Sequence, residues 1–302
     1  MSKVLVTGAM GFIGSKICDR FLARGDSVYG WDLVDGNRAD VPISKIDMLD
    51  QAAVSAALDA LRPDIIIHCA GNADVGKSVQ NPAMDYQGNV TITHDLLFAL
   101  QKLGLTKTRF VYMSSAGVYG NPASLPITED MPLKPMSPYA LHKVMCEQVC
   151  QYFIANYGMD IRIIRLFSAY GAGLRKQIFW DMFQKAENTG RLDMFGTGNE
   201  SRDFIHVEDV IQGIFLVATA DKREHTVFNV ANGEEITIRY ATELFAKHLG
   251  IAEENIAFNG TVREGDPLNW RADISRLTAL GYEKQVTMDA GLADYCQWVR
   301  RL

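Results

Sequence analysis

The fold is decided near the start of the chain, in the stretch Val4-Leu5-Val6-Thr7-Gly8-Ala9-Met10-Gly11-Phe12-Ile13-Gly14. A short apolar strand leads directly into glycines that recur at every third position. Such glycines allow a tight turn, let the backbone approach a pyrophosphate closely, and pack the following helix on its strand. The start of that helix offers free N–H groups and a positive dipole end to an anion. The stretch therefore predicts a dinucleotide site, with Gly8, Gly11, Phe12, Ile13 and Gly14 at the cofactor.

A second apolar strand, residues 27–32, ends in the acidic residue Asp32. A carboxylate roughly 20 residues beyond such glycines can accept hydrogen bonds from both ribose hydroxyls of an adenosine. It would also repel a 2′-phosphate, and the next residues, Leu33 and Val34, supply no cation to offset that repulsion. Arg38 is the only cation nearby, and we interpret it as loop surface. The sequence therefore favours NAD over NADP.

Apolar segments of strand length alternate with helical patterns, which is typical of a parallel sheet with helices on both faces. The expected strands are residues 3–7, 27–32, 44–46, 65–69, 109–113 and 161–166. The connection between Asp32 and Asp47 is short and is expected to contain little helix.

The alternation weakens after Phe167, where a second region begins. The sequence thus predicts an α/β fold with a doubly wound Rossmann sheet in an NAD-binding domain at residues 1–168. Residues 204–231 are expected to return to that domain. Residues 169–302 are expected to form a smaller C-terminal α/β lobe that binds the substrate.

Tyr139 and Lys143 stand four residues apart, downstream of a serine pair, Ser114 and Ser115, at the end of an apolar strand. A phenol has a pKa near ~10, so it can act as a base at neutral pH only if a cation lowers that pKa by roughly 3 units. Positions i and i+4 share one helix face, which lets the ammonium approach the phenol oxygen. Tyr-x-x-x-Lys alone occurs more often in an ordinary surface helix. Together with the glycine motif, it predicts a catalytic site of Ser115, Tyr139 and Lys143.

Composition and charge argue against several other classes of protein. The 302 residues are 48% hydrophobic and carry a formal net charge of −6, which disfavours a nucleic-acid partner. No segment approaches the ~18 apolar residues of a membrane span, and the N-terminal residues form a strand pattern rather than a signal peptide, so a cytoplasmic location is expected. The five cysteines lack Cys-x-x-Cys spacing and are expected to be buried thiols. The six scattered histidines suggest no metal site.

With these residues in view, the chain resembles the extended branch of the short-chain dehydrogenase/reductase superfamily, and within it the NAD-dependent nucleotide-sugar epimerases and dehydratases. The resemblance covers nearly the whole chain. Its markers are Thr-Gly-x-x-Gly-x-x-Gly at residues 7–14, Asp32, Asp47, His68-Cys69-Ala70-Gly71, Asn89, Ser-Ser-Ala-Gly-Val-Tyr-Gly at 114–120, Tyr139 with Lys143, Arg165-Leu166-Phe167-Ser168, Arg-Asp-Phe-Ile-His-Val at 202–207 and Arg-Glu-Gly-Asp-Pro at 263–267.

The resemblance implies further contacts to NAD and to a nucleotide-diphosphate sugar. For the cofactor these are Asp47, Met48, Cys69, Ala70, Gly71, Asn89, Ser114, Tyr139, Lys143 and Phe167. For the substrate they are Asp74, Ser115, Ser168, Arg175, Gln177, Arg202 and Arg263. Further candidates for the pocket lining are Asn72, Val75, Ser78, Asn121 and Trp180.

Three of these positions carry specific expectations. Arg202 and Arg263 match arginines that hold the diphosphate and the nucleotide ribose in the family, and a guanidinium suits that role because it forms bidentate bonds to oxyanions. Pairing with neighbouring carboxylates is the alternative for both. Ser168 stands where many relatives have asparagine, and a serine offers a shorter side chain with a single donor.

The residues after Ser115 narrow the reaction. Related 4,6-dehydratases place an Asp-Glu pair there and related decarboxylases a glutamate, whereas this chain has Ala116-Gly117, which cannot move a proton. The closest resemblance is to UDP-sugar 4-epimerases. It implies epimerisation at C4 through a transient 4-keto sugar by reversible hydride transfer, with Tyr139 as base and Ser115 bonded to the same oxygen.

Several alternatives remain open at this point. A 4-keto-sugar reductase could use the same trio, and a non-catalytic NAD-binding sensor could share the fold. The resemblance also suggests a role in polysaccharide biosynthesis and a homodimer formed through the helix with Tyr139 and the helix near residues 82–103. The identity of the nucleotide and of the sugar depends on pocket shape.

Overall fold

The computed structural model describes residues 1–36, 38–221, 224–261 and 267–302, so Arg263 lies outside the described residues. The chain divides into two compact units. The first comprises Met1–Val118, Pro135–Arg165 and Gly213–Phe228, and the second comprises Tyr119–Lys134, Leu166–Gln212 and Asn229–Leu302. The cofactor-binding and substrate-binding roles that the sequence suggests for two domains stay predictions.

A seven-stranded sheet forms the centre of the first unit, in the order β11-β6-β5-β4-β1-β2-β3. Its strands are β1 (Lys3–Thr7), β2 (Ser27–Asp32), β3 (Ile43–Lys45), β4 (Ile65–His68), β5 (Arg109–Ser115), β6 (Ile161–Leu166) and β11 (Val227–Val230). The pairs β1–β2, β1–β4, β2–β3 and β4–β5 are parallel. The predicted Rossmann fold is confirmed, with β3 one residue earlier than expected and β5 extended to include both serines.

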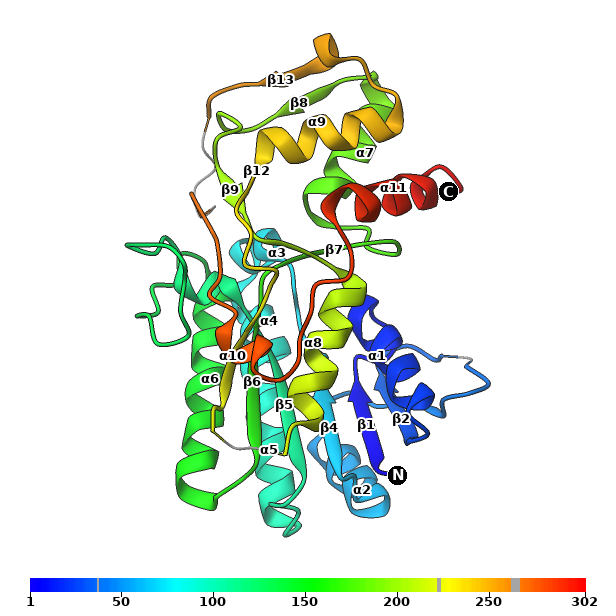
Figure 1. Ribbon diagram of the computed structural model, residues 1–302. Helices are drawn as coiled ribbons and strands as arrows, with labels where there is room; N and C mark the ends of the chain where they lie inside the picture. The colour runs from blue at the N-terminus through cyan, green and yellow to red at the C-terminus, as the bar shows by residue number, and fades with distance from the viewer. Residues whose placement is uncertain (37, 222–223, 262–266) are drawn as a thin grey trace. The chain divides into compact units, whose positions relative to one another are not determined.

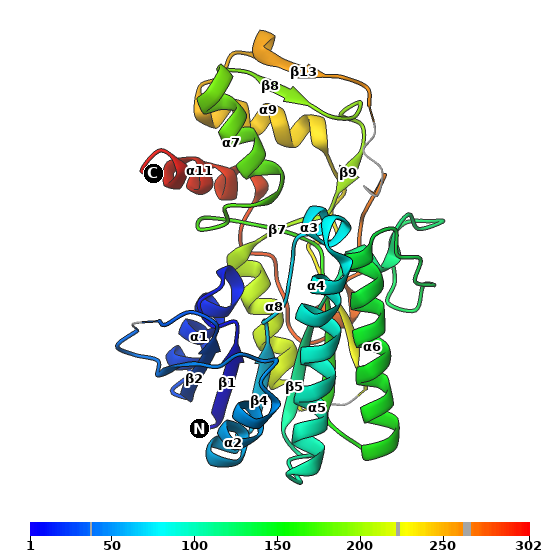
Figure 2. The same cartoon turned by 180° about the vertical axis from the view of Figure 1, so that it is seen from behind.

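Helices cover this sheet. They are α1 (Phe12–Ala23), α2 (Gln51–Leu61), α5 (Ile92–Lys102), α6 (Pro138–Tyr157) and α8 (Val207–Thr219). Figure 1 shows α8 in front of the strands, and Figure 2, seen from behind, shows α5 and α6 there. The guanidinium of Arg20 on α1 lies 4.4 Å over the ring of Phe215 on α8. Between β2 and β3 the described residues contain no helix, as the short connection predicted.

The helix α5 begins with an irregular turn. The short helix α4 (Pro82–Tyr86) continues through one π-helical turn, η1 (Gln87–Thr91), into α5. A π turn inside an α-helix widens the backbone locally and is frequent at functional sites. Asn89 stands in the middle of this turn and is buried. Another short helix, α3 (Val75–Gln80), packs against α4 and α6.

The buried core of the first unit explains why these segments pack together. It joins Leu5 and Ile66 of the strands with Leu96 of α5 and Phe153 of α6. Cys18, Cys146, Cys150 and Cys296 are buried thiols as expected, and Cys69 is partly buried.

The second unit contains short strands and helices around its own aromatic core. Its strand pairs are β7 (Ser168–Tyr170) with β10 (Phe204–His206), β9 (Ser201–Arg202) with β12 (Ile236–Thr237), and β8 (Leu192–Met194) with β13 (Ile256–Phe258). Its helices are α7 (Gln177–Thr189), α9 (Ile238–Leu249), α10 (Ser275–Thr278) and α11 (Met288–Val299). Two single 3-10 turns, η2 (Ala116–Tyr119) and η3 (Glu253–Asn255), complete the described elements.

The core of the second unit is built on Phe179, Phe245 and Tyr295, whose rings contact one another. In both units, none of the helices that the structure describes combines the length and the apolar character needed to cross a bilayer.

Candidate active site

The start of α6 positions the predicted base. Ser137 caps this helix by accepting a hydrogen bond from the N–H of Ala140 at 3.2 Å, and Pro138 occupies the first helical position. Both residue types favour a helix start. The N–H of Tyr139 donates to the hydroxyl of Ser78 on α3 at 3.1 Å, which ties this end of α6 to a neighbouring helix. The backbone that carries Tyr139 is therefore fixed from two sides.

The structure brings Ser115, Tyr139 and Lys143 together within the first unit. Ser115 ends β5, and its hydroxyl lies near enough to the phenol of Tyr139 to lower the pKa of that phenol. The ammonium nitrogen of Lys143 lies 5.7 Å from the centroid of the Tyr139 ring. The same ammonium donates to the main-chain carbonyl of Met113 at 2.9 Å and lies 5.0 Å over the ring of Tyr112. A phenol, a hydroxyl and an ammonium thus converge at the end of β5.

Burial acts against ionisation of this phenol. Burial raises the pKa of Tyr139 to about 12, against the opposing effect of the Ser115 hydrogen bond, and the carboxylate of Asp85 raises it further. Burial also lowers the pKa of Lys143. Lowering of the phenol pKa by Lys143, with help from the positive nicotinamide ring, stays a prediction, and loss of hydration acts against it.

The glycine motif forms a cradle in which side chains do not fit. A Cβ added to Gly14 would lie 2.1 Å from the carbonyl oxygen of Gly8, and a Cβ on Gly8 would lie 2.8 Å from the N–H nitrogen of Ala70. Gly8 also has a φ of +66°, a backbone conformation that glycine adopts freely. The cradle lies where β1 and β4 are neighbours and the strand order reverses, the place where such sheets bind dinucleotides.

Asp32 is held in place at the end of β2. Its carboxylate accepts hydrogen bonds from the N–H groups of Met10 at 2.9 Å and Leu33 at 2.8 Å. Arg38 proves to be more than loop surface, because its guanidinium bonds to the carboxylates of Asp40 and Asp19 and to the carbonyl of Ser15. The cation nearest to Asp32 along the chain is thus already paired, which fits the predicted preference for NAD.

The remaining residues expected at the cofactor mostly follow the carboxyl ends of the strands. Asp47 and Met48 follow β3, Cys69, Ala70 and Gly71 follow β4, and Ser114 lies near the end of β5. The carbonyl oxygen of the Asn89 side chain is buried and has no hydrogen-bond partner among the residues that the structure describes, and a Cβ on Gly71 would lie 2.8 Å from it. A buried acceptor without a partner is costly unless a ligand satisfies it. This oxygen and the glycine cradle together fit a dinucleotide.

Two expected cofactor or substrate residues have clear structural roles. Ser114 donates its hydroxyl to Glu147 at 2.6 Å, and Glu147 is ion-paired with Arg165 at 2.7 Å. Asp74 caps α3, where its carboxylate accepts the N–H of Lys77 at 2.9 Å. Contacts of either residue with a ligand stay predictions.

The second unit holds Phe167, which the sequence assigns to the cofactor, and Ser168, Arg175, Gln177 and Arg202, which it assigns to the substrate. Ser168 begins β7, and its N–H donates to the carbonyl of Asp203 at 3.1 Å. The guanidinium of Arg175 lies 5.8 Å over the ring of Trp180 and 5.9 Å over that of Trp298.

Gln177 and Arg202 also lie in this unit. Gln177 starts α7 with a φ of +65°, which is uncommon for a residue with a side chain. Arg202 donates to the carbonyl of Ser201 at 2.8 Å and lies 5.7 Å over the ring of Trp270. The side chain of Asn121 accepts the N–H of Leu268 at 2.7 Å.

The sequence did not reveal a polar cluster beside the trio. The carboxylate of Asp85, on α4, is fully buried and bonds to the side chains of Asn72 and His142. His142 stands between Tyr139 and Lys143 on α6. In the sequence, the cluster was indicated only by the position of His142 inside the Tyr-x-x-x-Lys motif. Its partner comes from a segment 57 residues away, which spacing alone does not indicate.

The chain is similar in sequence to known proteins. Residues 4–231 match the model of the NAD dependent epimerase/dehydratase family. The UDP-glucose 4-epimerase of Mycolicibacterium smegmatis is 33% identical, over 99% of this chain and 98% of that protein.

Solved structures with the same fold carry out different reactions. The UDP-glucose 4-epimerase of Thermus thermophilus, in complex with NAD, superposes with a TM-score of 0.87 at 28% identity and covers 99% of each chain. The dTDP-glucose 4,6-dehydratase of Streptomyces venezuelae, also with NAD bound, gives a TM-score of 0.89 at 28% identity over 99% of this chain and 97% of that chain. The fold is therefore shared by epimerases and dehydratases, and the side chains must decide between them.

Proposed function

The chain belongs to the NAD dependent epimerase/dehydratase family, and on that basis we propose that it epimerises a nucleotide sugar at C4, with Tyr139 as the base. It is an NAD-dependent enzyme of the extended short-chain dehydrogenase/reductase type. The observation that carries the proposal is the convergence of Ser115, Tyr139 and Lys143 at the end of β5.

The trio supplies the proton chemistry of the proposed reaction. The phenolate of Tyr139 takes the proton of the sugar 4-hydroxyl, and Ser115 hydrogen-bonds the same oxygen and stabilises its developing charge. When bound by the glycine cradle and Asp32, NAD would supply reversible oxidation at C4 and a positive charge. After the 4-keto sugar turns in the pocket, Tyr139 returns the proton to the oxygen, so that no other redox partner is consumed.

The role of NAD's positive charge follows from the raised pKa of Tyr139. With a pKa of about 12, the phenol is almost fully protonated at neutral pH. An opposite charge within about 4–6 Å can lower a pKa by roughly 1–3 units. We therefore assign activation of the base to Lys143 and the cofactor acting together, so that the phenol becomes a base when the cofactor is present.

The residues after Ser115 favour epimerisation over dehydration. Gly117 has no side chain, and its N–H donates to the Ser115 hydroxyl at 3.1 Å. Ala116 is buried and equally unable to exchange protons. Elimination of water across C5 and C6 needs an acid and a base beside the sugar, and neither of these two residues can serve.

For the substrate, we propose that the second unit holds the diphosphate. Arg175 and Arg202 hold their guanidinium groups 5.8 Å and 5.7 Å, respectively, from the centroid of a tryptophan ring, and a guanidinium can form bidentate hydrogen bonds to oxyanions. Ser168 and Gln177 are assigned to the same ligand. A nucleotide sugar as substrate agrees with the relatives, and the choice among UDP-sugars and other nucleotide sugars is left to experiment.

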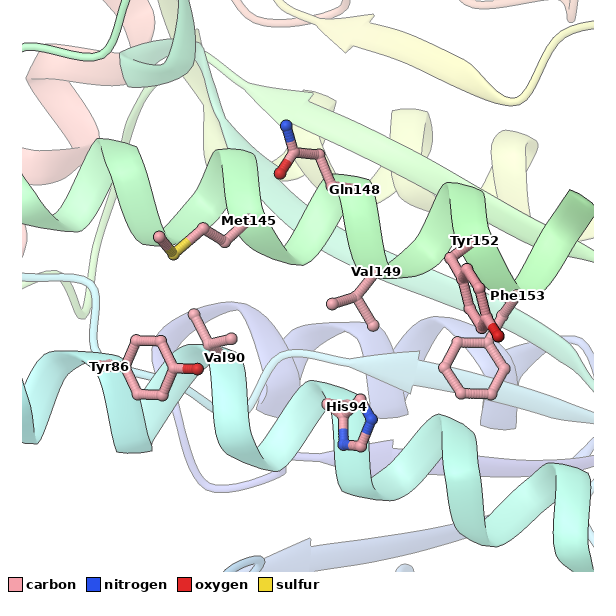
Figure 3. A pocket seen from close by; sticks show the side chains of 8 residues that line it. All are labelled: Tyr86, Val90, His94, Met145, Gln148, Val149, Tyr152 and Phe153. Atoms are coloured by element: carbon pink, nitrogen blue, oxygen red, sulfur yellow. The ribbon is translucent and has the colours of Figure 1, made fainter.

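We also propose a homodimer through α5 and α6. A groove of about 410 Å³ runs between α6 and the helix formed by α4, η1 and α5 (Figure 3). Its lining is largely apolar and aromatic: Tyr86, Val90, His94, Met145, Gln148, Val149, Tyr152 and Phe153. Tyr86 is 43% exposed and Tyr152 is 55% exposed, which is unusual for side chains of this size. A cytoplasmic location stays a prediction.

The proposed function is tested by supplying a panel of nucleotide sugars to the purified protein with NAD and no reductant. The expected result is interconversion of one nucleotide sugar with its C4 epimer until equilibrium is reached. Strict dependence on added NADH, with one equivalent consumed per product, would replace epimerisation by reduction of a 4-keto sugar.

A further inference from the structure

The carboxylate of Asp85 is hydrogen-bonded to several side chains beside the catalytic trio. Its carboxylate lies 2.5 Å from the side-chain nitrogen of Asn72 and 2.5 Å from Nδ1 of His142. A third, longer bond of 3.3 Å comes from the side-chain nitrogen of Asn89. Asp85 is completely buried, and its partners come from three segments, which together hold the carboxylate in one orientation. A buried carboxylate is costly unless it is paired and hydrogen-bonded, so this site is built to contain a charge.

The pair of Asp85 and His142 lies next to the groups that carry the reaction. His142 follows Tyr139 by three residues and precedes Lys143 directly on α6. The charge of Asp85 raises the pKa of Tyr139 and supports the ammonium form of Lys143. It therefore opposes the phenolate that the proposed reaction needs.

Other titratable groups surround these residues. On α6, Cys146 also raises the pKa of Tyr139 and supports the ammonium form of Lys143. On β5 the Tyr112 ring contacts the Lys143 ammonium, and on α4 the ring of Tyr86 lies edge-on to His142 at 5.5 Å. On α3, exposed Lys77 and partly buried Asp74 are the charged groups, and Asp74 is bonded to its own helix. Among these neighbours, His142 is the one in direct hydrogen-bond contact with Asp85 that can carry a positive charge.

From this arrangement, and resting on the proposed function, we propose that Asp85 and His142 act as positioning residues that set the electrostatic balance at the catalytic base. In this proposal the imidazole of His142, whose Nδ1 lies 2.5 Å from the carboxylate, supplies the counter-charge to Asp85. Asp85 in turn orients Asn89, whose side-chain oxygen faces the Gly71 backbone at the dinucleotide site. The pair thus affects both the electrostatic environment of Tyr139 on α6 and the orientation of Asn89 at the cofactor site.

The test is the pH dependence of turnover in three variants of the NAD-loaded enzyme. Asp85→Asn removes the negative charge, whereas His142→Asn removes the positive charge and keeps an N–H donor toward Asp85. The proposal expects the acidic limb of the kcat profile to move down by roughly 0.5–1 pH unit in Asp85→Asn and up by a similar amount in His142→Asn. The double variant should lie between the two single variants. His248→Asn, at an exposed His–Asp pair in the second unit, is the matched control and should leave the profile in place.

Opposite shifts distinguish an electrostatic role from a purely structural one. The proposal is overturned if both single variants lose activity at every pH while the acidic limb stays in place. It is also overturned if the acidic limb moves in the same direction in both variants. Thermal unfolding of each variant identifies loss of folding. Should Asp85→Asn fail to fold, His142→Asn alone decides, because an unmoved limb in that variant removes the counter-charge role.

Failure of the inference can be separated from failure of the proposed function. If the unaltered enzyme turns over no nucleotide sugar, the proposed function fails. The effect of the Asp85 and His142 charges on the pKa of Tyr139 is then measured through the absorbance of the Tyr139 phenolate. That signal is the difference between proteins with Tyr139 and with Tyr139→Phe, titrated with NAD bound. A midpoint that moves in opposite directions in Asp85→Asn and His142→Asn supports the inference, and a midpoint that stays fixed in both overturns it.

Discussion

The ammonium of Lys143 lies 5.7 Å from the centroid of the Tyr139 ring, one helical turn along α6. It donates a hydrogen bond to the carbonyl of Met113, at 2.9 Å, so the lysine is anchored to β5 beside the phenol. An anchored cation at this distance can favour a phenolate, but burial of the phenol acts more strongly in the opposite direction. We therefore expect activation of the proposed base to depend on binding of the cofactor.

Replacement of the base should remove activity and spare the fold. Tyr139→Phe deletes the phenol oxygen, and general acid–base catalysis typically contributes 10²–10⁴-fold, so a fall in kcat of about that size is expected. Steady-state turnover and thermal unfolding are the measurements. Tyr240→Phe, at a half-exposed tyrosine of the second unit, is the control and should retain full activity. Near-normal turnover by Tyr139→Phe would assign the base to another residue.

The ionisation of Tyr139 should depend on the cofactor. In protein without nucleotide the pKa of this phenol is about 12, raised by burial, so it stays protonated through the physiological range and loses its proton only near pH 12. Saturation with NAD adds positive charge and should move the midpoint to lower pH. The measurement is the phenolate absorbance of the unaltered protein minus that of Tyr139→Phe. An identical midpoint with and without NAD would contradict activation by the cofactor.

The glycine cradle should not tolerate a methyl group. In Gly14→Ala the new Cβ would stand 2.1 Å from the Gly8 carbonyl oxygen, so the turn must move and the pyrophosphate loses its close approach to the backbone. We expect NAD affinity to fall at least tenfold in a binding titration. Gly76→Ala on α3 is the control, since its Cβ would meet Asp74 at an ordinary 3.4 Å. Equal NAD affinity in both variants would place the dinucleotide elsewhere.

A charge in the apolar groove should separate the proposed dimer. Tyr152 is 55% exposed and lines the groove on α6, so Tyr152→Glu would place a carboxylate against an apolar partner surface. Sedimentation or light scattering should show a dimer for the unaltered protein and a monomer for this variant. Tyr240→Glu, at another exposed tyrosine, should stay dimeric. A monomeric unaltered protein at micromolar concentration would refute the dimer.

Much of the fold could be predicted because its signals are local. The strand before Gly8 and the strand ending in Asp32 were predicted at the bounds that the structure shows, since apolar segments and glycines report directly on backbone shape. The trio was also predictable. Tyr139 and Lys143 share one helix face, and Ser115 ends a strand of the same sheet.

Interactions set by tertiary packing could not be predicted in the same way. Asp85 and His142 come from different helices, and no periodic pattern signals that pairing. The π turn around Asn89 depends on how α4 joins α5, and the sequence there is compatible with an ordinary helix. The rise in the pKa of Tyr139 could not be predicted either, because the sequence displays the nearby lysine but does not display burial of the phenol.

The most direct test of the central claim follows one hydrogen atom. A nucleotide sugar labelled with deuterium at C4 is incubated with the enzyme and NAD in ordinary water, and the C4 epimer is analysed by mass spectrometry and NMR. If the proton handled by Tyr139 belongs to the 4-hydroxyl and the C4 hydrogen returns to the same carbon, the product retains the deuterium at C4. Loss of the label to solvent, or its replacement by hydrogen from added NADH, would contradict epimerisation through a self-contained oxidation and reduction at C4.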